Sequence, residues 1–89
     1  MKLKKDAVHS DERTATFFRG LDVVCESAGV DFFALEVEGQ EEFLNEKFHD
    51  IVEECVRIGG EEYVQFYNFI PLIVENEGCA VIYFSKRKQ

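Results

Sequence analysis

The sequence predicts an α+β domain in which two helices pack on one face of a small, mainly antiparallel sheet. Two stretches repeat apolar residues at helical spacing, shorter stretches are rich in β-branched and aromatic residues, and a hairpin turn signal lies near the C-terminus. The predicted order is α-β-α-β-β-β, without an internal repeat. Because the last strands follow one another instead of alternating with helices, the pattern favours an α+β class.

The first helix is predicted over residues 11–28. Ser10 is the expected N-cap, and Gly29 is a residue that ends helices well. The apolar stripe comprises Thr14, Phe17, Phe18, Leu21, Val24, Cys25 and Ala28. A strand is then predicted over residues 31–37, where alternate residues point to opposite faces.

A second helix is predicted over residues 41–58, ended by Gly59 and Gly60. Its core stripe comprises Leu44, Phe48, Ile51, Val52, Cys55 and Ile58. Strands are predicted over residues 63–69, 72–75 and 79–84. The last two flank Asn76-Glu77-Gly78, which we expect to form a three-residue hairpin loop.

The charge of the chain is divided between its ends and its body. We expect a flexible basic lead over residues 1–9, a single domain over 10–85 and a basic tail over 86–89. The formal net charge is −8, but 18 acidic residues and only four basic ones lie between Asp6 and Phe84, a balance of −14. A body this acidic repels phosphate, so the sequence argues against nucleic-acid binding through the folded surface.

Four acidic residues recur at helical spacing on the outer side of the second predicted helix: Glu42, Glu46, Asp50 and Glu53. We call them the acidic stripe. One interpretation is a solvated face that keeps the protein soluble. The other is a docking surface for a basic protein partner, in its most specific form an inhibitor that mimics nucleic acid.

The predicted sheet is apolar on both faces, and two helices cover only one. An antiparallel sheet with one wet face should alternate with polar residues. The second face is therefore expected to meet a partner, most simply a second copy of the chain in a homodimer. The residues expected at this dimer or apolar face are Tyr63, Tyr67, Phe69 and Tyr83.

No catalytic set can be assembled from the sequence, so we predict neither enzyme activity nor a cofactor. Cys25 and Cys55 lie on core stripes, and an acidic body disfavours a thiolate at any of the cysteines. His49 with Glu46 and Glu53 supplies too few ligands for a predicted metal site.

Two other functions stay open: a small-molecule or metal-binding domain with a pocket between helices and sheet, and a structural subunit of a larger assembly. The odd number of cysteines, without a Cys-x-x-Cys pair, favours free thiols in a reducing compartment, here the cytoplasm. No apolar run approaches the length of about 18 residues that spans a membrane.

Overall fold

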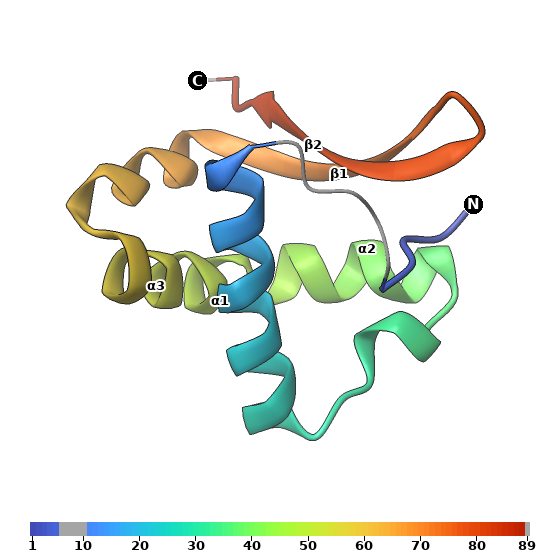
Figure 1. Ribbon diagram of the computed structural model, residues 1–89, viewed down its shortest axis with the longest axis horizontal. Coiled ribbons are helices and arrows are strands. Elements are labelled where there is room, and N and C mark those ends of the chain that lie inside the picture. The colour runs from blue at the N-terminus through green and yellow to red at the C-terminus, as the bar shows by residue number, and fades with distance from the viewer. Residues whose placement is uncertain (6–10, 89) are drawn as a thin grey trace.

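A computed structural model describes residues 1–5 and 11–88 and confirms the α+β class (Figure 1). The elements in chain order are α1 (Glu12–Ala28), the 3₁₀ helix η1 (Phe32–Ala34), α2 (Val37–Glu46), α3 (Phe48–Gly59), the 3₁₀ helix η2 (Glu61–Asn68), β1 (Phe69–Asn76) and β2 (Cys79–Lys86). Within the described residues the sheet has two strands only. The predicted order with four strands, and two helices packed on their sheet, is therefore wrong in detail.

Helix α1 matches its predicted range, and both of its ends carry a cap. Asp11 accepts a hydrogen bond from the Thr14 N–H at 2.7 Å, which satisfies one of the free donors of the first turn. The predicted cap Ser10 lies outside the described residues. Gly29 adopts a left-handed backbone, and the Val30 N–H donates to the Cys25 carbonyl at 3.0 Å. This pattern is a Schellman-type helix end.

The strand predicted over residues 31–37 is wrong. The Ala34 and Leu35 N–H groups donate back to Asp31 and Phe32, so this backbone is satisfied within a local turn and needs no neighbouring strand. Phe32 is buried, and its ring lies 6.0 Å from that of Phe43. Burial of this ring next to α2 outweighs the strand-like alternation of the sequence.

The single helix predicted over residues 41–58 is two helices separated at Lys47. Helix α2 begins at Val37, four residues earlier than predicted, and α3 ends at Gly59. The Lys47 N–H donates to the Phe43 carbonyl oxygen, and the Lys47 carbonyl oxygen accepts from the Ile51 N–H, both at 2.9 Å. These bonds keep α2 and α3 nearly in line, as Figure 1 shows.

Helix α1 crosses α3 at Gly20, which explains a glycine inside a helix. A Cβ atom on Gly20 would lie 2.9 Å from the Ile51 carbonyl oxygen and 3.0 Å from Cys55 Sγ. The two backbones therefore approach each other more closely than any other residue would allow. Around this contact lies the core, whose fully or nearly fully buried side chains include Phe17, Leu21, Leu44, Ile51, Val52 and Cys55.

Residues 63–69 were predicted to form a strand, and this prediction is also wrong. They belong to η2 and to the first residue of β1. Tyr63 and Phe66 are three residues apart, so a 3₁₀ helix turns both side chains into the core while Val64 and Gln65 stay exposed. The Tyr63 hydroxyl group also lies 3.3 Å from Thr16 Oγ1, a hydrogen bond that ties η2 to α1.

The predicted hairpin is confirmed, although its turn is shorter than expected. Asn76 pairs with Cys79, so Glu77 and Gly78 alone form the turn, with φ angles of 51° and 81°. Positive φ at both positions is typical of a type I′ turn. The hairpin lies across the helices (Figure 1), and its inner face, which includes Ile73, Ile82 and Phe84, packs against the core.

Candidate functional site

The acidic stripe is exposed along its whole length. Glu42 and Glu46 belong to α2, and Asp50 and Glu53 belong to α3. Their spacing of three or four residues places them on successive turns. Because α2 and α3 run nearly in line, the break at Lys47 does not separate the two pairs. The structure therefore brings together the four residues that were singled out from the sequence.

Few basic side chains form ion pairs with the acidic stripe. His49 Nε2 lies 3.0 Å from Glu53 Oε1, and both side chains are well exposed. The only other ion pair among the described residues joins Arg57 to Glu54, next to the stripe. The His49–Glu53 pair is exposed on both sides and contributes at most about 1 kcal/mol. Glu42, Glu46 and Asp50 of the stripe take part in neither pair.

Tyr67 lies at the edge of the acidic stripe. Its ring is partly buried and lies 5.1 Å from the ring of His49. Burial raises the pKa of the Tyr67 phenol, and the carboxylates of Glu53 and Asp50 raise it further. The phenol is therefore a stable hydrogen-bond donor beside a row of acceptors.

The four residues predicted at the dimer or apolar face lie at different places. Tyr63 is buried in the core, Tyr67 borders the stripe, and Phe69 is partly buried at the start of β1. Tyr83 alone is well exposed, at 56%. The four side chains are dispersed because residues 63–68 form a 3₁₀ helix, in which side chains do not alternate between two sheet faces.

The hairpin nevertheless has a second apolar side, on which Leu72 and Tyr83 are exposed, and the residues expected from the sequence include only Tyr83. The register pairs Leu72 with Tyr83 and Val74 with Val81, and Ile70 shares their side of β1. We call these five residues the outer face. The apolar alternation in both hairpin strands is the signal for this side, but three of the four residues expected there come from the segment 63–69, most of which is a 3₁₀ helix.

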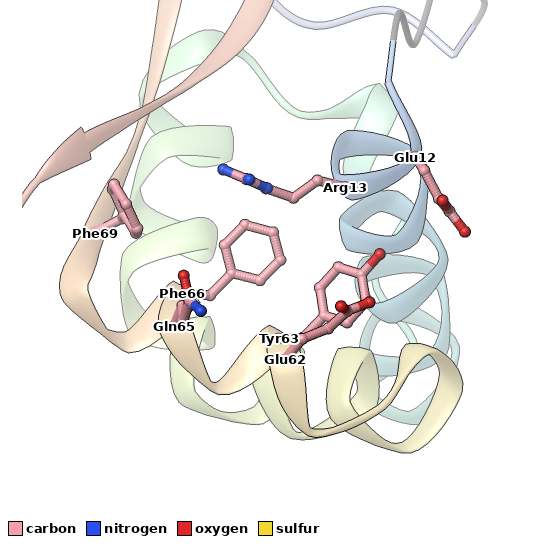
Figure 2. A pocket seen from close by; sticks show the side chains of 7 residues that line it. All are labelled: Glu12, Arg13, Glu62, Tyr63, Gln65, Phe66 and Phe69. Atoms are coloured by element: carbon pink, nitrogen blue, oxygen red, sulfur yellow. The ribbon is translucent and has the colours of Figure 1, made fainter.

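A shallow pocket of about 260 Å³ lies between the start of α1, η2 and the start of β1. Figure 2 shows the Arg13 side chain extending above the ring of Phe66. The lining residues are Glu12, Arg13, Glu62, Tyr63, Gln65, Phe66 and Phe69. The volume of this pocket falls below the range of about 300–1,000 Å³ typical of ligand pockets.

The three cysteines are free, and two of them, Cys25 and Cys55, are buried. Burial raises the pKa of the Cys25 thiol to about 11, with a further contribution from Asp22. Burial likewise raises the pKa of Cys55 to about 12, and Glu54 adds to the shift. Cys55 Sγ also lies 3.6 Å from the Thr16 carbonyl oxygen, its acceptor in the core. These two thiols serve as core side chains, since only a thiolate is an effective nucleophile.

We expect iodoacetamide at pH 8 to modify Cys79 and to leave Cys25 and Cys55 unmodified in dilute native protein. A pKa of about 11 or higher leaves a thiolate fraction of about 0.1% or less at this pH. Intact mass measured at timed intervals should show one adduct per chain, and three adducts after addition of denaturant. A second adduct forming as fast as the first in native protein would contradict this placement.

Across residues 1–5 and 11–88, no group of three or more His, Cys, Asp or Glu side chains is arranged to hold a metal ion. The helices of the described part are all too short or too polar to cross a membrane. Comparison with models of protein families, with curated proteins and with solved structures finds no match to this chain. The candidate function therefore depends on the geometry of the surface itself.

Proposed function

We propose that this chain is a non-catalytic protein-interaction domain that binds a basic protein through its acidic stripe. The observation that carries the proposal is the row of four exposed carboxylates on successive turns of α2 and α3, of which only Glu53 contacts an imidazole. A surface of one charge sign attracts an oppositely charged partner over a distance and raises the rate of association.

The more specific form of the proposal is inhibition by mimicry of nucleic acid. Residues four apart on a helix are separated by about 6 Å along its axis. The stripe therefore presents negative charges in a line, as a phosphate backbone does. A basic protein that binds DNA or RNA would accept the stripe at the site where it accepts phosphates, and excess oligonucleotide would displace the domain.

A triple charge reversal tests the proposal. We expect Glu42→Lys, Glu46→Lys and Glu53→Lys together to abolish binding to a basic protein captured from host lysate on the wild-type chain. All three side chains are exposed, so the far-ultraviolet circular dichroism spectrum should not change. The measurement is the dissociation constant for the purified pair, by isothermal titration calorimetry at two salt concentrations.

The matched control reverses three exposed acids away from the stripe: Asp22→Lys, Glu26→Lys and Asp31→Lys. Both triple variants change the net charge equally. The control variant should keep its affinity within a few-fold if the stripe is the docking surface. Equal losses in the two variants would indicate net charge alone, and unchanged affinity in the stripe variant would refute the docking surface.

Two further features complete the proposal. The three free thiols support a location in a reducing compartment, which we propose to be the cytoplasm. The apolar outer face supports self-association, so we propose that the domain is a homodimer.

A further inference from the structure

We infer that η1 and α2 form a peptide-binding site, and that its ligand is a segment of another protein in which a lysine precedes a leucine in an extended backbone. Residues 1–5 of the chain, dark blue in Figure 1, occupy this site in cis and compete with that ligand. The inference goes beyond the proposed function, because the site lies on the buried side of α2 and uses no residue of the acidic stripe.

Gln40 binds the main chain of the occupant from the interior of the protein. Its side chain is fully buried. The Leu3 N–H donates to Gln40 Oε1 at 2.8 Å, and Gln40 Nε2 donates to the Leu3 carbonyl oxygen at 3.0 Å. An extended residue presents its N–H and its carbonyl group to the same side, as in a pair of antiparallel strands. The Gln40 amide therefore binds the backbone of one extended residue through both groups.

Two side chains of the occupant are recognised as well. Leu3 is fully buried and belongs to the core cluster, so the site includes a hole in the core that fits a leucine. Lys2 is half-buried, and its Nζ donates to the Phe33 carbonyl oxygen of η1 at 3.0 Å. The other three residues of the segment are exposed. The contacts therefore select a lysine followed by a leucine and leave the neighbouring residues free to vary.

A buried glutamine is not the residue that packing alone would select at this position of α2, where Phe43 and Leu44 also enter the core. Burying an amide costs free energy unless its polar atoms are hydrogen-bonded. Two of the three hydrogen bonds of Gln40 go to Leu3, and the third goes to the Phe32 carbonyl oxygen. When the segment leaves, the amide loses both bonds to Leu3 and presents an acceptor and a donor to an incoming backbone.

The segment is attached in a way that another chain can reproduce. Among residues 1–5 and 11–88, no hydrogen bond between two backbone groups joins this segment to the rest of the protein. Its hydrogen bonds all involve the side chain of Gln40 or of Lys2, and Leu3 is its one buried residue. A segment held by so few groups can leave the site by local opening while the helices stay folded.

Competition within the chain weakens binding of an external segment. Residues 1–5 belong to the same molecule, so their effective concentration at the site is high. The apparent affinity for an external segment is reduced to the fraction of molecules in which the site is open. Removal of the Leu3 side chain should therefore raise the affinity for an external peptide.

Binding of a peptide in trans tests the site. The probe is the acetylated and amidated peptide with the sequence of residues 1–5, and the receptor is the full-length chain carrying Leu3→Ser. Titration followed by two-dimensional NMR spectra should give a dissociation constant at least about tenfold lower for Leu3→Ser than for the wild type. The peptide should also raise the urea midpoint of Leu3→Ser, since it binds the folded state, and leave that of the wild type unchanged.

Two altered peptides and a pair of variants separate recognition from nonspecific binding. The peptide carrying Leu3→Ser should bind about tenfold more weakly or worse, because the hole stays empty. A depsipeptide with an ester in place of the amide between Lys2 and Leu3 lacks the N–H that donates to Gln40, and should lose a similar factor. Gln40→Ala added to Leu3→Ser should remove binding, whereas Gln65→Ala, on exposed η2, should not. The depsipeptide decides the role of Gln40 even where the double variant fails to fold.

Each contrary outcome overturns a stated part of the inference. Failure of the peptide to bind Leu3→Ser at millimolar concentration would reduce residues 1–5 to a structural part of the core. Equal affinities for the wild type and Leu3→Ser would place the peptide elsewhere on the acidic surface. Equal affinities for the peptide and the depsipeptide would overturn main-chain recognition by Gln40. None of these results bears on the acidic stripe, whose test uses other residues.

Discussion

Replacement of Phe17 by alanine is expected to lower the free energy of unfolding by about 4 kcal/mol, a large effect for a single substitution. Phe17 is fully buried, and its ring lies 4.9 Å from that of Phe84 and 5.6 Å from that of Phe66. The rings of Phe18 and Phe48 are neighbours as well. One side chain of α1 therefore contacts α3, η2 and β2.

The expected loss is a large part of the total stability. A chain of this length has a free energy of unfolding of about 4–13 kcal/mol. Phe17→Ala should therefore leave a marginally folded or unfolded protein. Urea titration followed by circular dichroism measures the change. Phe17→Leu retains most of the apolar volume and should cost less than half as much, and Val64→Ala, at an exposed site, should cost about 0.5 kcal/mol or less.

A Phe17→Ala variant within about 1 kcal/mol of the wild type would mean that the core can close around the missing ring. It would contradict the central position given to α1. If Phe17→Ala is too unstable to purify, Phe17→Leu supplies the measurable comparison, because the leucine side chain stays buried but lacks the contacts of the Phe17 ring.

Elements whose signals are local were predictable from the sequence. Helix α1 has its apolar stripe and Gly29, which both act within a few residues of the chain, whereas its N-cap is Asp11 and not the expected Ser10. The hairpin has Gly78 at a position where the backbone requires positive φ. The acidic stripe was predictable for the same reason, because helical spacing alone places its residues on successive turns.

Elements that depend on tertiary burial were not predictable. The segments 31–37 and 63–69 are both apolar and aromatic, which favours a strand. Yet the first buries Phe32, and the second buries Tyr63 and Phe66, from a 3₁₀ turn. In the second segment, the three-residue spacing of Tyr63 and Phe66 was a usable signal for η2. The loss of these strands also dispersed the residues predicted at the apolar face and left the outer face of the hairpin in their place.

A contact at the N-terminus gave no signal in the sequence at all. Residues 1–9 read as a flexible basic lead, but Leu3 is fully buried and Lys2 Nζ donates to the Phe33 carbonyl at 3.0 Å. Residues 6–9 of that lead lie outside the described residues. The partner of Leu3 is Gln40, a buried amide 37 residues away, and no local pattern predicts such a pairing.

Gln40→Ala is expected to lower the free energy of unfolding by about 2–3 kcal/mol and to release the N-terminal segment. The Gln40 side chain is fully buried. Its Oε1 accepts from the Leu3 N–H at 2.8 Å, and its Nε2 donates to the carbonyl oxygens of Leu3 at 3.0 Å and Phe32 at 3.3 Å. Without the amide, these buried groups lose their partners or Leu3 leaves the core, and either change costs this amount.

Limited proteolysis distinguishes release of the segment from general loss of stability. Trypsin should cut after Lys4 or Lys5 faster in Gln40→Ala than in the wild type, at a urea concentration where both proteins remain folded. Gln65→Ala is the matched control, since Gln65 is exposed on η2 and should change neither the cleavage rate nor the stability. Equal cleavage rates in Gln40→Ala and the wild type would contradict the role of Gln40 in holding Leu3.

Gln40→Glu separates the hydrogen bonds from the volume of the side chain. A carboxylate still accepts from the Leu3 N–H but cannot donate to the two carbonyl oxygens, and burial penalises its charge. Burial therefore raises the pKa of this carboxyl in the folded state above its unfolded value of about 4.3. The variant gains stability relative to the wild type as the pH falls through that raised pKa, because the protonated carboxyl can donate. The difference in unfolding free energy between the wild type and Gln40→Glu should be larger at pH 7.5 than at pH 4.5. A difference that does not depend on pH would show that the Gln40 side chain only fills space.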